Sequence, residues 1–120
     1  MGERIVDPVV HLELRTDNLA RACAFYGELF GWRFEPVHLG GATYHAVDVG
    51  GRIQGGIVEC DEARPRWLPY VEVPDLAAMT ERARSLGATV TLEPREGPAG
   101  WRSTLLTRAG GDVALWQPKA

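Results

Sequence analysis

Residues 8–34 read PVVHLELRTDNLARACAFYGELFGWRF, and this stretch decides the fold of the 120-residue chain. Apolar and polar residues alternate over positions 9–15, which predicts a strand with one buried face. Residues 16–18 (TDN) can cap a helix, and apolar residues then recur at three- and four-residue steps over positions 19–30. Gly31 can adopt the positive φ that ends a helix. The stretch therefore predicts a strand, a capped helix and the start of a second strand.

The same order recurs in residues 67–90, WLPYVEVPDLAAMTERARSLGATV, as a degraded copy. Asp75 corresponds to Asn18 and can cap a second helix. The apolar side of this helix is expected to comprise Leu76, Met79, Ala83 and Leu86, with Gly87 ending it. The chain is thus an internal repeat of one strand–helix unit.

Glycine turns divide the remaining residues into hairpins. We expect further strands at residues 32–39, 42–49, 52–60, 68–73, 88–94, 101–107 and 111–117, a linker at 61–66 and a loop at 95–100. Each half is then a βαβββ module, the first over about residues 8–60 and the second over about 67–118, within a single domain spanning residues 1–120. The expected fold class is α+β.

A helix covers one face of each predicted sheet and leaves the opposite face open. Two such helix-free faces, turned toward each other, would enclose a trough. Alternation places these residues on the helix-free faces: His11, Glu13, Arg15, Leu68, Tyr70, Glu72, Ala114 and Trp116.

Composition narrows the classes of partner. The net charge of −3 and the absence of a basic run argue against nucleic acid. Cys23 and Cys60 show no metal-binding spacing, and no apolar segment is long enough for a signal peptide or a membrane span. No phosphate-binding loop, dinucleotide fingerprint or nucleophile elbow is present. We expect a cytoplasmic protein that binds a small molecule, and a homodimer because so short a chain buries a modest fraction of its surface.

His11 and Glu13 are the candidate catalytic residues. Two positions apart on one strand, their side chains project from the same face, and a carboxylate near an imidazole can orient it as a general acid or base. The alternative is that both are polar residues bonded to neighbours or water. In Tyr44-His45 only one side chain can share that face, and alternation leaves open which one.

The other candidate ligand contacts are aromatic or charged. The ring of Tyr70 suits a flat, apolar ligand and its hydroxyl can bond one, while Trp101 and Arg102 follow the 95–100 loop at an expected rim. The full set of expected ligand-binding residues is Tyr44, His45, Tyr70, Glu72, Trp101 and Arg102.

Residues 9–34 resemble the opening module of the vicinal oxygen chelate superfamily, which includes glyoxalases, bleomycin-resistance proteins and extradiol dioxygenases. Residues 100–118, GWRSTLLTRAGGDVALWQP, look like the closing hairpin of its small single-domain members. The resemblance implies paired βαβββ modules in a cupped, barrel-like mixed sheet with the helices outside. It also implies, in the metalloenzyme members, a divalent ion held by His, Glu or Gln side chains from four strands.

The implied metal positions are largely without donors in this chain. His11 occupies the first, Leu68 and Ala114 occupy those on the fifth and last strands, and the fourth-strand position falls on Glu59 or on Gly55 or Gly56. Because a stable divalent site wants three or more protein ligands, no cofactor is expected. If a metal does bind, His11 and Glu59 are its expected ligands.

Two classes of function follow, with a third behind them. The first is a small-molecule binding protein of the glyoxalase or bleomycin-resistance type without the family metal. The second is a metal-independent isomerase, lyase or cyclase that uses His11 and Glu13 as acid and base. The third is a metal-dependent lyase or dioxygenase. The sequence does not identify the ligand.

Overall fold

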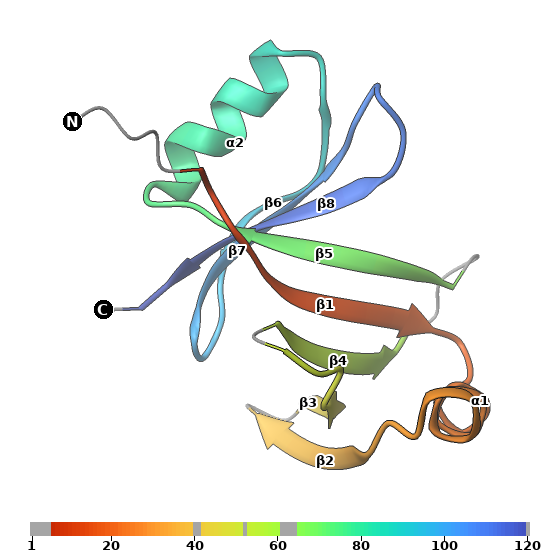
Figure 1. Ribbon diagram of the computed structural model, residues 1–120. Helices are drawn as coiled ribbons and strands as arrows, with labels where there is room; N and C mark the ends of the chain where they lie inside the picture. Colours follow the sequence, from red (N-terminus) through yellow and green to blue (C-terminus); the bar gives the residue numbers. More distant parts are fainter. Residues whose placement is uncertain (1–5, 40–41, 52, 61–64, 120) are drawn as a thin grey trace. The chain divides into compact units, whose positions relative to one another are not determined.

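The computed structural model describes residues 6–39, 42–51, 53–60 and 65–119, which form eight strands and two helices within the described part (Figure 1). In chain order the elements are β1 (Val9–Thr16), α1 (Leu19–Phe30), β2 (Phe34–Leu39), β3 (Ala42–Val47), β4 (Gln54–Glu59), β5 (Arg66–Glu72), α2 (Leu76–Ser85), β6 (Thr89–Glu96), β7 (Gly100–Leu106) and β8 (Asp112–Pro118). This order is βαβββ twice over, so the expected α+β class is confirmed.

Module one pairs its strands in the order β2-β3-β4-β1, with β1 parallel to β4 and the other pairs antiparallel. Its core forms where α1 meets the sheet, around Leu14, Ala22 and Ile57. Asn18 is the residue that caps α1, because its side chain accepts a hydrogen bond from the Arg21 amide at 3.0 Å. The helix ends as expected at Gly31, with φ of 71°.

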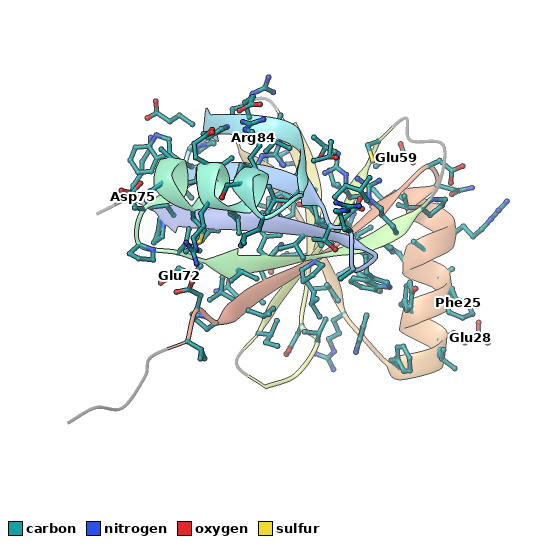
Figure 2. The ribbon with its side chains drawn as sticks, turned by 90° about the horizontal axis from the view of Figure 1, so that it is seen from above. Phe25, Glu28, Glu59, Glu72, Asp75 and Arg84 are labelled. Atoms are coloured by element: carbon teal, nitrogen blue, oxygen red, sulfur yellow. The ribbon has the colours of Figure 1, made fainter. Side chains whose placement is uncertain are left out.

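Aromatic rings extend the core of module one. The indole Nε1 of Trp67 donates to the Tyr26 hydroxyl at 3.2 Å, and Trp32 stacks on Tyr26 with ring centroids 5.4 Å apart. On the outer side of α1, shown by Phe25 and Glu28 in Figure 2, apolar side chains stay exposed: Phe25 is 56% accessible and Leu29 is 58% accessible.

Module two pairs its strands in the order β5-β8-β7-β6, with β5 parallel to β8. Helix α2 lies against β6, β7 and β8 (Figure 1) and closes a core of Val73, Leu76, Leu105 and Leu115. The Asp75 side chain caps α2 by accepting from the Ala78 amide at 3.0 Å. Met79 and Ala83 pack against this core as the apolar stripe predicts, whereas Leu86 is 72% exposed because α2 ends at Ser85.

Most strands begin or end one or two residues away from the expected bounds, and two of these differences change the connections between strands. β5 begins at Arg66, inside the expected linker, of which residues 61–64 lie outside the described residues. β6 and β7 continue pairing through Arg95–Arg102 and Glu96–Trp101, across two register shifts, so the expected 95–100 loop is shorter. The Gly97 amide donates to the Gly100 carbonyl at 2.7 Å and closes this turn. β-Bulges, which alternation cannot reveal, permit the extension.

The chain divides into two units, residues 10–69 and residues 1–9 with 70–120. No helix in the described residues is long and apolar enough to cross a membrane.

Candidate functional site

The helix-free face of module one carries His11, Glu13 and Arg15 from β1. Leu14 and Thr16, the intervening residues, are buried toward α1, so alternation turns the three polar side chains the other way. In the parallel register Glu13 lies opposite Gly56 of β4. A Cβ atom at Gly56 would stand 3.4 Å from both Cε1 and Nε2 of His11. The His11 ring therefore rests against bare backbone on this face.

The register of β3 decides between Tyr44 and His45. A Cβ atom at Gly56 would lie 3.5 Å from Cδ2 of Tyr44, so the Tyr44 ring shares the face of His11. His45 is paired with Ile57, a core residue beneath α1, and so points to the helix side of the sheet. Its Nδ1 atom is buried without a hydrogen-bond partner among the described residues. Tyr44 thus joins His11, and His45 does not.

On this face Glu13 forms an ion pair with Arg15 and also influences the imidazole of His11. Arg15 Nη1 donates to Glu13 Oε2 at 2.8 Å, with both side chains about four-fifths removed from solvent. Burial lowers the pKa of the His11 imidazole from its ordinary value of 6.5, and the nearby Glu13 carboxylate opposes that shift. At neutral pH the His11 ring is neutral, so it carries both a hydrogen-bond donor and an acceptor nitrogen.

Glu59 lies at the end of β4, and its side chain caps the N-terminus of α1. Its Oε2 accepts a hydrogen bond from the Leu19 amide at 2.9 Å, at the first turn of α1. Gln117 of β8 does the same for α2, accepting from the Leu76 amide at 2.8 Å. Helix N-termini have unsatisfied amides that side-chain oxygens can bind. The internal repeat therefore extends to these long-range caps.

The helix-free face of module two carries Tyr70, Glu72, Arg102 and Trp116. In the strand registers Tyr70 lies opposite Ala114, while Glu72 and Arg102 lie opposite Trp116 from its two sides. Tyr70 is buried, at 6% exposure, and its ring meets that of Trp116 edge-on with centroids 6.4 Å apart. Arg102 Nη1 donates to the Tyr70 hydroxyl at 3.3 Å.

Trp101 is turned away from this group. It packs against the core cluster beneath α2, and the Lys119 ammonium lies 5.7 Å from the centroid of its ring. Because neighbouring residues in a strand face opposite sides, Trp101 and Arg102 cannot share a face. Of the two, Arg102 is the one placed with Tyr70.

The residues at the implied metal positions do not fit a metal. Gly56 is the β4 residue beside the His11 ring, and Leu68 and Ala114 are buried at 1% and 0% exposure. These three side chains offer no donor atom, which leaves His11 alone where three or more ligands are needed. Within the described ranges no three His, Cys, Asp or Glu side chains gather in a way that could hold a metal ion.

Two further residues lie with His11, Glu13 and Tyr44 on the helix-free face of module one. Gly56 and Arg15 are not among the expected catalytic or ligand-binding residues. A glycine inside a strand pattern often marks a close approach of another group, and this signal could have singled out Gly56. Arg15 could be placed on the face by alternation, whereas its ion pair with Glu13 depends on side-chain conformation.

Residues 10–115 match the family of glyoxalase-like domains, and the chain belongs to this family. The fold is that of the vicinal oxygen chelate superfamily, as the resemblance of residues 9–34 implied.

One curated relative and several solved structures are similar to the chain. The anthracycline biosynthesis protein DnrV of Streptomyces peucetius is 32% identical over 107 residues, which is 87% of this chain and 39% of DnrV. The chain thus spans about two fifths of that relative's length. Methylmalonyl-CoA epimerase from Mycobacterium tuberculosis has a TM-score of 0.64 at 22% identity, covering 93% of this chain and 88% of its own. A Streptomyces coelicolor methylmalonyl-CoA epimerase variant in complex with 2-nitronate-propionyl-CoA has a TM-score of 0.65 at 17% identity, covering 97% and 100%. The two epimerase structures show a shared fold.

Proposed function

We propose that this protein binds a small organic molecule on the helix-free face of module one, without a metal ion. The observation that carries the proposal is the convergence of His11, Glu13 and Tyr44 on a face that α1 does not cover, with Gly56 leaving the His11 ring against backbone. A neutral imidazole and a phenol offer hydrogen bonds, and the Tyr44 ring offers a flat apolar surface. A few polar groups beside an aromatic wall are typical of small-molecule sites.

The proposed ligand class is a flat, polycyclic aromatic compound of the anthracycline kind. Support comes from DnrV, a relative whose name places it in anthracycline biosynthesis. Aromatic ligands stack on or pack edge-on against rings, and Tyr44 supplies one in module one.

Binding without turnover is favoured over catalysis by the state of Glu13. Its carboxylate is already engaged by Arg15 at 2.8 Å, so it is held in place as an ion-pair partner.

A second candidate is a metal-independent isomerase, lyase or cyclase in which His11 is the general base. The lowered pKa of His11 favours this candidate, because a neutral imidazole at pH 7 can accept a proton. Glu13 would then stabilise the imidazolium that forms.

Titration with quinizarin (1,4-dihydroxyanthraquinone), followed by quenching of tryptophan fluorescence, tests the binding proposal. We expect saturable binding in the micromolar range, and about tenfold weaker binding for His11→Ala, as loss of one good polar contact predicts. His38→Ala is the matched control, since His38 is exposed on β2. Absence of saturable quenching would overturn the binding proposal for this class of ligand.

Chromatography with mass detection on the same samples separates the two candidates. Quinizarin recovered unchanged supports binding without turnover. A product that forms with the parent protein and disappears with His11→Ala, while quenching persists, would replace the first candidate with the second.

A further inference from the structure

Arg102 in module two holds a positive charge that no carboxylate neutralises among the described residues. The residue is half-buried on β7, and its one side-chain hydrogen bond within the described part of the chain goes to the phenol oxygen of Tyr70, at 3.3 Å. A phenol is neutral at physiological pH, so this bond orients the guanidinium without compensating its charge. Removing a charge from water is costly unless a counter-charge accompanies it.

The neighbouring strand adds to the positive charge. Arg95 of β6 lies directly opposite Arg102 in the antiparallel register, and like charges in that position repel each other. The two carboxylates of β6 are engaged elsewhere: Glu93 with Arg84 at 2.9 Å, and Glu96 with Lys119 at 2.8 Å. Neither carboxylate of β6 therefore compensates the positive charge of the Arg102 guanidinium.

An aromatic wall stands beside the guanidinium. Trp116 is the β8 residue opposite Arg102, it is half-buried, and its ring meets that of Tyr70 edge-on. Glu72 lies opposite Trp116 from the other side, one strand further from Arg102. A flat molecule on the Trp116 ring would carry its own anionic oxygen toward Arg102 and away from Glu72.

We propose that Arg102 is an anion-binding residue, positioned by Tyr70, and that the helix-free face of module two binds a flat organic anion bearing a carboxylate or phenolate. The inference goes beyond the proposed function, because it concerns module two alone. The Arg102 site itself can be tested independently. Arginine suits the task because its planar donors bind carboxylate oxygens in pairs.

Nuclear magnetic resonance titration with benzoate and with benzamide tests the site directly, since the two probes differ in charge and hardly in shape. The signals to follow are the Arg102 Nε–H and the Trp116 indole N–H. We expect saturable shifts of both signals with benzoate, and about tenfold tighter binding of benzoate than of benzamide, because charge-assisted hydrogen bonds are roughly twice as strong as neutral ones.

Three variants sharpen the test. Arg102→Gln should bind the two probes equally, and Arg102→Lys should keep part of the preference because it keeps the charge. Tyr70→Phe should broaden or shift the Arg102 Nε–H signal and reduce the preference without abolishing it. Arg82→Gln, the same change at an exposed position of α2, should leave the preference intact.

Equal affinity for benzoate and benzamide, no saturable shift at Arg102, or undiminished benzoate binding by Arg102→Gln would each overturn the anion site. These outcomes are distinct from failure of the proposed function, which is read from quinizarin binding and its weakening by about tenfold in His11→Ala. A protein that binds quinizarin but does not prefer benzoate retains its function and loses this inference.

Discussion

The imidazole of His11 lies against the backbone of Gly56, so that a Cβ atom at Gly56 would stand 3.4 Å from two of the ring atoms. The preceding residue of β4, Gly55, has a different environment. A Cβ atom at Gly55 would lie 2.7 Å from Cγ1 of Val47 and 2.8 Å from Cγ1 of Val49. Adjacent glycines in one strand thus face different partners, one on the candidate ligand face and one on the opposite side.

This contrast predicts opposite results for two alanine substitutions. Gly55→Ala should destabilise the protein by about 1–3 kcal/mol, because its methyl group overlaps packed valine side chains. Gly56→Ala should cost less than about 1 kcal/mol, because its methyl group reaches only close van der Waals contact, yet it should move the His11 resonances. Urea unfolding and proton spectra of the two variants check both effects. Equal stability losses would contradict the assigned faces of β4.

The lowered pKa of His11 predicts a specific pH dependence of stability. Below the ordinary value of 6.5 the unfolded chain binds a proton at His11 before the folded chain does. Stability contributed by His11 is therefore fully present above pH 6.5, and it falls with decreasing pH until the folded state also takes up the proton. His11→Gln should remove this part of the dependence between about pH 7.5 and pH 5.5, as measured by urea unfolding.

His38→Gln, at an exposed position of β2, is the comparison variant for that experiment. A direct titration of the His11 ring by nuclear magnetic resonance should give a midpoint below 6.5. A midpoint at or above that value would mean that the Glu13 carboxylate, and not burial, controls the ring.

The buried hydroxyl groups of Thr80 and Ser103 in module two form a pair, and removing one or the other should cost different amounts of stability. Thr80 donates to the Leu76 carbonyl at 2.7 Å, so the proton in the 2.9 Å contact between Thr80 Oγ1 and Ser103 Oγ comes from Ser103. Both residues are 0% exposed. Thr80→Val should cost about 1–3 kcal/mol, because it strands the Ser103 donor, and Ser103→Ala should cost less.

The double variant Thr80→Val with Ser103→Ala should be less destabilised than the sum of the single variants, because no donor then lacks an acceptor. Unfolding in urea measures all four proteins. Additive losses would show that the hydroxyl contact contributes little to stability.

The long-range caps predict matched effects in the two modules. Glu59→Ala and Gln117→Ala should each destabilise the protein by about 1 kcal/mol, since each removes an acceptor from a helix N-terminus. Glu59→Gln should keep most of the stability, because an amide oxygen can still accept from the Leu19 amide. Glu28→Ala, on the outer side of α1 (Figure 2), is the neutral control.

Metal analysis of the same variants tests the structural role of Glu59 further. The metal content of purified Glu59→Ala should equal that of the parent protein. A lower content in Glu59→Ala but not in Glu28→Ala would indicate that Glu59 is a metal ligand, as the family resemblance would allow.

Parts of the candidate site could be predicted from sequence because strands alternate. The placement of His11, Glu13 and Arg15 on one face follows from period two, and the placement of Tyr70 with Trp116 follows in the same way. Sequence could not decide whether Tyr44 or His45 lies on the face of His11, because the residues that follow them show no regular alternation of apolar and polar side chains. Only the pairing of β3 with β4 fixes it.

The sequence by itself determined the two βαβββ modules, a cap for α1 within residues 16–18, the Asp75 cap of α2 and the end of α1 at Gly31. These features depend on contacts within a few residues, which local propensity and periodicity describe. The tertiary structure decided that Glu59 caps α1, that His11 rests on Gly56 and that Arg102 is held by Tyr70. Each of these contacts joins residues more than thirty positions apart, and strand pairing, which no single segment encodes, brings them together.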